Sequence, residues 1–373
     1  MTEPIRVLHV FGRLDTGGAE TMIMNVYRNI DRSKVQFDFI VHTKEKCDFD
    51  GEVKHLGGKI HRIQQYIGRN HFQYKKAWHN FFRQHPEYNI IHGHMRSTAA
   101  IYLKIAKQYG LTTIAHSHST SSGSGFSAIA KNILQYPIRY ISDYFFACSE
   151  NAGKWLFGKQ ILRSNKFFIV KNTIDSKSFV FNKLVRLKKR KEFNIEDKFV
   201  IGHIGRFSYP KNHMFLLDIF KEIHKENENA ILMLVGDGEL RQQIERKIID
   251  LNLLDNVIFT GVRSDVPELL QAMDVFVFPS LYEGLGIVTI EAQAAGVPCI
   301  VADTIPKEAY VTDLIKPICL KESAIIWAEN ILKYTNKFKR RNTYEEIKNS
   351  GYDILETTKW LQDFYMGSET NYD

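Results

Sequence analysis

The chain has 373 residues, of which 44% are apolar and 25% are charged, the balance of an ordinary globular protein. This length exceeds what one hydrophobic core usually supports, which favours two domains. The sequence has no apolar run of the roughly 20 residues that a membrane-spanning helix needs, no signal-peptide layout and no CxxC pair, and so predicts a reduced, cytoplasmic protein without structural zinc.

The net charge of +8 is carried by the first half of the chain. Residues 1–170 contain 23 Lys and Arg against 12 Asp and Glu, whereas residues 171–373 contain 27 against 30. Basic and aromatic residues are mixed over 62–83, which predicts either an amphipathic helix with a solvated face or adhesion to anionic lipid or a phosphate-bearing acceptor. Because no nucleic-acid-binding motif is present, no nucleic-acid partner is expected.

Strands alternate with helices along the first half. The first apolar strand runs into a glycine-bearing turn and then a helix at 19–29. Helical segments also separate the later strands, and the five strands of this half are expected at 5–11, 37–41, 89–92, 112–115 and 144–147.

The same alternation restarts after residue 198. The charged stretch 183–196 lies between the two halves and is interpreted as a linker. The second set of strands is expected at 199–204, 230–235, 257–259, 275–278 and 298–301. The whole pattern predicts an α/β protein with two doubly wound, parallel-sheet, Rossmann-like domains that face each other across a cleft, where the active site is expected.

In chain order, the first candidate site is the glycine pair Gly17 and Gly18 in the turn after the first strand. A glycine pair in such a turn is weak evidence for a ligand. It is not the GxGxxG fingerprint of dinucleotide-binding proteins, which argues against a nicotinamide enzyme.

The second candidate is the pair His116 and His118 at the end of a predicted strand, before a Ser- and Gly-rich run. Such histidines can bond a sugar hydroxyl or move a proton, although ordinary hydrogen-bonded histidines fit as well. His92 and His94 would join them if the strands are neighbours, but no carboxylate or cysteine completes a metal-ligand set. No metal ion or other cofactor is therefore expected.

The third candidate is the turn 202–212, which also follows a predicted strand. Its Arg206 and Lys211 could bring two positive charges onto a diphosphate leaving group, whose charge grows as the sugar–phosphate bond breaks. Fixed cations can do this without a metal ion. The alternative is two solvated surface bases.

The fourth candidate is a strand, glycine turn and helix at 275–295, the layout of a phosphate-binding turn. Glu283 lies in the turn and Glu291 lies in the first turns of the helix. As hydrogen-bond acceptors, the two carboxylates can bind the paired hydroxyls of a ribose or a hexose. The alternative is a solvated loop residue and a partner of the helix dipole.

Together these residues resemble the family 4 glycosyltransferases, which are retaining enzymes of the GT-B architecture. The resemblance covers essentially the whole chain, and its most specific part is the E-x7-E motif of Glu283 and Glu291. Gly-Gly-Ala-Glu-Thr-Met from Gly17 and His-Ser-His from His116 are similar to the branch that builds bacterial capsular and extracellular polysaccharides. The resemblance implies an acceptor-binding domain over 1–180, with a helix at 355–373 packed back onto it, and a donor-binding domain over 181–354.

The resemblance also implies roles for the candidate residues. Glu291 would bind the ribose, and Glu283 the hydroxyls of the donor sugar. Either His118, which we favour, or His116 would face the reacting sugar. The diphosphate and its surroundings would be bound by Arg206, Lys211, the loop Gly17 and Gly18, and the backbone of Gly284, Leu285, Gly286 and Ile287.

The implied reaction moves a hexose or N-acetylhexosamine from a UDP-sugar to a hydroxyl of a growing, lipid-linked polysaccharide repeat unit, with retention of configuration and without a metal ion. A protein on the inner face of the cell membrane would suit the basic first half. Two rival interpretations are a nucleotide-sugar epimerase of the same fold, which needs no acceptor, and a nucleotide-sugar-binding protein without turnover.

Overall fold

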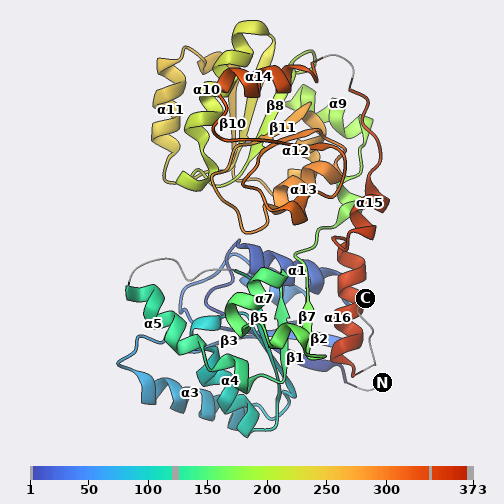
Figure 1. The fold of residues 1–373 in the computed structure, drawn as a ribbon. Helices are drawn as coiled ribbons and strands as arrows, with labels where there is room; N and C mark the ends of the chain where they lie inside the picture. Colours follow the sequence, from blue (N-terminus) through green and yellow to red (C-terminus); the bar gives the residue numbers. More distant parts are fainter. Residues whose placement is uncertain (1–2, 120–125, 336–337, 368–373) are drawn as a thin grey trace. The chain divides into compact units, whose positions relative to one another are not determined.

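The computed structural model describes residues 3–119, 126–335 and 338–367. The chain divides into two compact units (Figure 1), the first formed by Met1–Ile174 and Gly351–Asp373 and the second by Asp175–Ser350. None of the helices in the described ranges is long and apolar enough to cross a membrane.

The first unit contains a seven-stranded, fully parallel sheet in the order β3-β2-β1-β4-β5-β6-β7. Its strands are largely apolar and buried, as expected of a parallel sheet covered on both faces. They are β1 (Ile5–Phe11), β2 (Val35–Val41), β3 (Ile60–Arg62), β4 (Ile90–Gly93), β5 (Thr112–Ser117), β6 (Tyr144–Ala147) and β7 (Phe167–Ile169).

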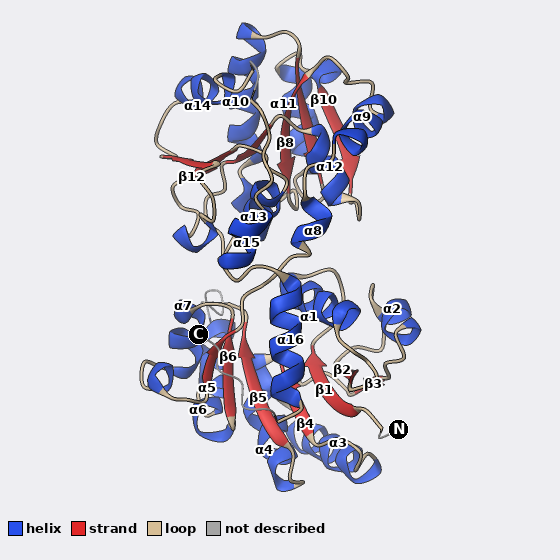
Figure 2. Cartoon of the chain, turned by 90° about the vertical axis from the view of Figure 1, so that its right-hand side faces the viewer, coloured by secondary structure: helices blue, strands red, loops and turns tan. Residues whose placement is uncertain are grey.

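Helices cover both faces of this sheet. One apolar core lies beneath α3, α4, α6 and α7, and another lies beneath α1, α2 and α16. Figure 2 shows α16 beside α1 over the middle of the sheet. The helices are α1 (Gly18–Asn29), α2 (Asp50–His55), α3 (His71–Gln84), α4 (Ala99–Gln108), α5 (Phe126–Gln135), α6 (Ile138–Ile141), α7 (Glu150–Phe157) and α16 (Ile354–Tyr365), with 3-10 turns η1 (Arg96–Thr98) and η2 (Ile161–Arg163).

The second unit contains a six-stranded parallel sheet in the order β10-β9-β8-β11-β12-β13. All four side chains of its central strand β11 are fully buried, which explains why the strand is apolar throughout. The strands are β8 (Phe199–Ile204), β9 (Ala230–Val235), β10 (Val257–Gly261), β11 (Val275–Phe278), β12 (Cys299–Ala302) and β13 (Ile315–Ile318).

In the second unit, α10, α11 and α14 pack on one face of the sheet, while α9, α12 and α13 lie together on the other (Figure 1). The helices are α8 (Ser176–Phe179), α9 (Lys183–Glu192), α10 (His213–Glu226), α11 (Arg241–Asp250), α12 (Val266–Ala272), α13 (Ile287–Ala294), α14 (Ala324–Leu332) and α15 (Tyr344–Asn349), with 3-10 turns η3 (Tyr209–Lys211), η4 (Leu254–Asn256) and η5 (Lys307–Ala309).

The interpretation of 183–196 as a linker was wrong. Residues 183–192 form α9, which packs on α12. Two of its basic side chains are buried and neutralised, because Lys189 bonds Asp265 at 2.5 Å and Arg190 lies 3.2 Å from Asp274. The run of charges resembled a solvated connection because Asp265 and Asp274, which neutralise its buried bases, lie more than 70 residues away in the sequence.

Candidate functional site

The predicted site residues cluster at one place in each sheet. Strand order reverses between β1 and β4 in the first unit and between β8 and β11 in the second. In open parallel sheets, ligands bind beyond the carboxyl ends of the strands at this point. Arg206 and Lys211 follow β8, and Glu283 follows β11, so the structure places all three at the reversal in the second sheet.

The closest contact at this reversal joins Lys211 to Glu283. The lysine Nζ donates to the glutamate Oε1 at 2.6 Å and lies 4.8 Å from the centre of the Phe278 ring. The two loops are also joined through their backbones, because Leu281 N–H donates to the Pro210 carbonyl at 2.8 Å. A lysine and a glutamate that are 72 positions apart thus form one partly buried pair.

Arg206 lies in the same loop but is much more exposed. Its side chain is 74% exposed and its Nε lies 3.2 Å from an oxygen of Glu239, which follows β9. The loops that follow β8 and β9 are tightly apposed, since a Cβ on Gly236 would lie 2.2 Å from the Gly205 carbonyl oxygen. The exposed guanidinium is therefore free to turn toward a ligand, with Glu239 as its only ion-pair partner among the described residues.

The glycine turn after β11 leads into α13 as predicted. Gly286 is its N-cap residue, with φ of 75°, a left-handed conformation that favours glycine, and it provides no capping side chain. A Cβ on Gly284 would meet no atom within 4 Å. Leu285 and Ile287 flank the N-cap, so the first backbone N–H groups of α13 are in place to bind an anion beside the Lys211–Glu283 pair.

Glu291 lies one turn into α13 and, unlike Glu283, forms no ion pair with a described residue. Burial raises the pKa of Glu291 to about 7. A carboxyl in such surroundings gains from hydrogen-bond donors, because donors stabilise its ionised form. Paired hydroxyl groups are donors of this kind.

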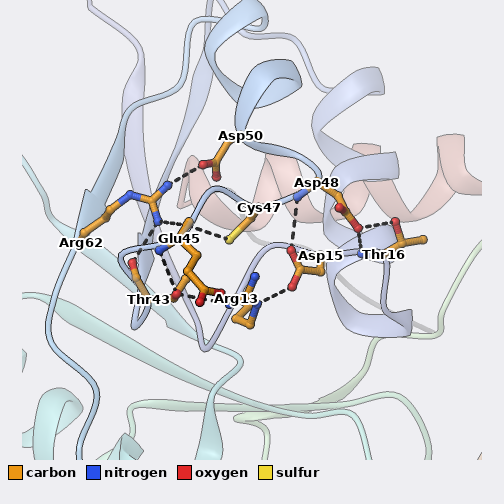
Figure 3. Close-up of polar contacts among 9 residues, drawn as sticks. All are labelled: Arg13, Asp15, Thr16, Thr43, Glu45, Cys47, Asp48, Asp50 and Arg62. Atoms are coloured by element: carbon orange, nitrogen blue, oxygen red, sulfur yellow. Dashed lines mark hydrogen bonds and ion pairs between the residues drawn. The ribbon is translucent and has the colours of Figure 1, made fainter.

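The loop after β1 in the first unit is fixed by a polar network with the segment that follows β2 (Figure 3). Arg13 bonds Asp15 and donates to Glu45 at 2.5 Å, while Thr16 bonds Asp48 through its backbone and its hydroxyl at 2.9 and 3.0 Å. These contacts hold the backbone just before Gly17 in one place.

The two predicted glycines begin α1 directly after this network. Gly17 is the N-cap residue and carries no capping side chain, and a Cβ on it would lie 2.4 Å from an oxygen of Glu20. A Cβ on Gly18 would meet no atom within 4 Å. The first unit therefore also presents an uncapped helix start beside the end of β1.

The predicted histidines of the first unit belong to a cluster of five. His9 on β1 pairs in register with His92 on β4, and His116 lies on the neighbouring strand β5. His94 and His118 lie directly after the ends of β4 and β5. His9 Nδ1 lies 3.0 Å from His94 Nε2, and His94 Nδ1 lies 2.8 Å from His118 Nε2. The cluster therefore extends from the middle of the sheet to its carboxyl edge at the strand reversal.

A second chain of contacts runs through the same cluster from α16. The hydroxyl of Tyr365 lies 2.7 Å from His92 Nδ1, and His92 Nε2 lies 3.1 Å from His116 Nδ1. Burial lowers the pKa of all five histidines, to about 3 for His9 and His118, so all are neutral at physiological pH. His116 is only 1% exposed, whereas His118 is partly exposed.

The sequence left open whether the strands that lead to these histidines are neighbours. They are: β4, with His92 and His94, pairs with β5, with His116 and His118. Two trios, His9 with His92 and His94, and His94 with His116 and His118, bring one nitrogen per residue within 4.8 Å of the others. Neutral imidazole nitrogens at this spacing are able to ligate a transition metal. In the free protein these nitrogens bond largely to one another.

Three contacting residues were given no role by the sequence prediction. His9 and Tyr365 join the histidine cluster, and Glu239 pairs with Arg206. Glu239 belongs to a Gly-Asp-Gly-Glu run from Gly236 that contributes to the family resemblance, and His9 is polar although it lies on the same face of its strand as Val7 and Phe11. Tyr365 lies 273 positions from His92, and no local pattern predicts such a contact.

Two family models match the chain in succession. Glycosyltransferase Family 4 matches residues 16–178, and Glycosyl transferases group 1 matches residues 185–351. Over 368 residues the chain is 33% identical to a putative glycosyltransferase of Bacillus subtilis (strain 168), EpsF, covering 96% of both. It is 25% identical to the capsular polysaccharide biosynthesis glycosyltransferase CapH of Staphylococcus aureus, covering 97% of this chain and 99% of CapH.

A further relative is the UDP-Gal:alpha-D-GlcNAc-diphosphoundecaprenol alpha-1,3-galactosyltransferase of Escherichia coli, 25% identical over 76% of this chain and 77% of its own. Among solved structures, HepE of Anabaena in complex with UDP and glucose is similar, with a TM-score of 0.75 at 18% identity over 97% of this chain and all of HepE. WaaG, a glycosyltransferase involved in lipopolysaccharide biosynthesis, gives a TM-score of 0.68 at 16% identity, covering 98% of this chain and all of WaaG.

Proposed function

Since the chain belongs to the family 4 glycosyltransferases, in the branch that builds bacterial capsular and extracellular polysaccharides, we propose that it transfers a hexose or N-acetylhexosamine from a UDP-sugar to a hydroxyl of a lipid-linked repeat unit. The transfer retains the anomeric configuration and uses no metal ion. The enzyme works in the cytoplasm on the inner face of the cell membrane, and the acceptor is a glycan on a lipid diphosphate.

The observation that carries this proposal is the Lys211–Glu283 pair at the strand reversal of the second sheet. A cation, a carboxylate and an uncapped helix start meet there, which together suit a sugar linked to a diphosphate. HepE, which shares the fold, has been solved with UDP, with UDP-glucose and with UDP and glucose. These complexes support a UDP-sugar as the donor.

Each donor residue has a role that follows from its chemistry. Arg206 and Lys211 bind the diphosphate together with the backbone N–H groups from Gly284 to Ile287. Glu283 accepts hydrogen bonds from donor-sugar hydroxyls while staying close to Lys211, and Glu291 accepts them from the ribose hydroxyls. Gly17 and Gly18 let the backbone of the first unit approach the phosphates and the acceptor.

The reaction balances without a covalent enzyme intermediate. The bond from the anomeric carbon to the diphosphate oxygen breaks, and the acceptor oxygen bonds that carbon on the same face. The acceptor proton passes to the departing diphosphate, whose growing charge Arg206 and Lys211 stabilise. His118, with His116 as the alternative, presents a neutral ring nitrogen to the reacting sugar.

The decisive experiment follows transfer from UDP-sugars to a lipid-diphosphate glycan and reads the new anomeric centre by NMR. We expect Lys211→Ala to lower kcat/KM by about 100-fold to 1000-fold, the usual range for one group that stabilises developing charge. The matched control is Lys225→Ala, which should leave the rate unchanged. It removes an exposed lysine whose only ion-pair partner in the described ranges is Glu222 on the same helix.

Four outcomes would contradict the proposal. Full activity in Lys211→Ala would remove the diphosphate assignment. An inverted product would remove the same-face mechanism. A new UDP-sugar formed without any acceptor would identify an epimerase, and binding without turnover would leave only a nucleotide-sugar-binding protein.

A further inference from the structure

An apolar stripe is exposed on the described part of the first unit. Four side chains of α5, α6 and their junction are largely exposed: Ile129 by 56%, Ile133 by 69%, Tyr136 by 51% and Tyr140 by 74%. Their spacing of four, three and four residues places them along one side of a helical path. We call these four residues the α5–α6 stripe.

The stripe is the outer face of an element that is firmly packed on its inner face. Ala128, Gln135 and Ile138 are buried, and α5 lies against η1 and α4. Figure 1 shows α5 at the edge of the first unit. Large apolar side chains that gather on one exposed face mark an interaction surface more often than scattered ones do.

The charge around the stripe is of one sign. Residues 53–142 contain twelve Lys and Arg but a single acidic residue, Glu87. Lys131 on α5 is exposed. Arg139 is half-buried, lies over the Tyr136 ring at 4.0 Å and donates to the Leu156 carbonyl at 3.1 Å. Neither makes an ion pair with any residue that the structure describes, so no acidic side chain in the described ranges neutralises either charge.

Apolar residues, interfacial tyrosines and unpaired cations together fit one occupant. A bilayer with anionic headgroups takes the apolar side chains into the acyl boundary, the tyrosine rings at headgroup depth and the basic groups against phosphate. A second copy of the chain fits poorly, because two such basic surfaces repel each other.

We propose that the α5–α6 stripe seats the first unit on an anionic lipid surface. The inference rests on the proposed function in one respect: an acceptor carried on a lipid diphosphate lies at such a surface. The place in the fold suits this role, because α5 follows β5, whose end carries His116 and His118. The stripe lies outside residues 62–83, where the sequence suggested lipid adhesion, and the aromatic side chains of α3 are mostly buried.

The test is sedimentation of the full chain with vesicles of phosphatidylcholine alone or mixed with phosphatidylglycerol. We expect binding to the mixed vesicles only, weakening as salt is added. Loss of one isoleucine side chain from the lipid is expected to weaken binding by about tenfold. The double change Ile129→Glu with Ile133→Glu should therefore abolish sedimentation. Lys131→Gln with Arg139→Gln should weaken it and flatten its dependence on salt.

The matched control is Leu254→Glu, which places the same charge at a leucine of the second unit that is 65% exposed. It should sediment like the parent chain, and thermal melting should show all variants folded. Equal sedimentation of the stripe variant and the parent would overturn the inference. The inference would also be overturned if the parent chain does not bind vesicles but forms a dimer, or a complex with an acidic protein, that the stripe variant does not form.

Failure of this inference and failure of the proposed function are distinguishable. Vesicle binding is measured without substrate, and transfer is measured separately with a water-soluble acceptor glycan. If the stripe variant keeps transfer to the soluble acceptor but loses it with a vesicle-bound acceptor, both proposals stand. If the parent chain binds vesicles but transfers nothing to either acceptor, only the membrane inference survives.

Discussion

At the scale of single residues, two carboxylates of one motif have different surroundings. Glu283 is neutralised by Lys211 at 2.6 Å, whereas burial raises the pKa of Glu291 to about 7. A diphosphate would compete with Glu283 for Lys211, while ribose hydroxyls would give Glu291 hydrogen bonds. Donor binding therefore changes the electrostatics of both residues in the roles proposed for them.

The raised pKa of Glu291 makes a prediction about stability and pH. The folded chain holds this proton more tightly than the unfolded chain, whose carboxyl has a pKa near 4.5, so stability falls as pH rises from about 4.5 to about 7. Glu291→Gln removes this ionisation. We expect the variant to exceed the parent chain by about 1–3 kcal/mol at pH 8, with no such gain below pH 4.5.

Urea unfolding at these two pH values measures the difference. The same variant should lose UDP binding, because an amide is a poorer acceptor for two hydroxyls than a carboxylate. Identical pH dependence in the two proteins would show that Glu291 already has its donors in the free protein.

Substitution of Gly18 can distinguish whether glycine is needed there for folding or for function. A Cβ at this position meets nothing within 4 Å, so Gly18→Ala should leave the unfolding free energy unchanged or raise it by up to about 1 kcal/mol. If the helix start touches ligand, transfer falls by at least about tenfold. The control is Gly51→Ala in α2, which also enters open space. Equal rates for both variants would remove Gly18 from the site.

At the scale of elements, α16 brings the end of the chain into the first unit. Asp353 caps this helix by accepting a hydrogen bond from Leu355 N–H at 2.9 Å, and the helix packs beside α1. Its last residue, Tyr365, then contacts His92 in the histidine cluster. A helix near the end of the chain thereby fixes side chains on strands that form near its beginning.

This arrangement predicts the effect of Tyr365→Phe. The change removes a buried hydrogen bond of 2.7 Å and leaves His92 Nδ1 without that partner, at a cost of about 1–3 kcal/mol of unfolding free energy in urea. It should also lower kcat more than KM, because His116 receives its orientation through His92. With a water-soluble acceptor, which does not require the α5–α6 stripe, Tyr140→Phe at an exposed tyrosine should change neither quantity. An unchanged kcat would limit Tyr365 to a packing role.

At the scale of the whole molecule, the proposed function assigns the diphosphate to two cations, Arg206 and Lys211, and to no metal ion. In these proposed roles the two side chains would carry the charge that a divalent ion would otherwise supply, so we expect transfer to continue at its full rate in EDTA. Activity that is lost in EDTA and restored by Mg²⁺ would contradict this role. Restoration by Zn²⁺ alone would instead point to the histidine trios.

Much of the fold could be predicted because it depends on local patterns. Continuous apolar runs such as 5–11, 199–204 and 275–278 match β1, β8 and β11 at both ends. The strands β3 and β7 were missed, since three residues give too little pattern to distinguish a strand from a loop. The strand β13 was missed because its middle residues, Lys316 and Pro317, are exposed and only Ile318 is buried. Charged α9 was missed because its partners lie far along the chain.

The sequence by itself determined the family, the two parallel-sheet units and the residues worth testing, because strand periodicity and the E-x7-E motif are local properties. Only the tertiary structure decided which of these residues meet: Lys211 with Glu283, His9 with His94, and Tyr365 with His92. It also decided which side chains are left exposed, as in the α5–α6 stripe. Contacts across the sheet and burial depend on how the strands are ordered, and that order is a property of the folded chain.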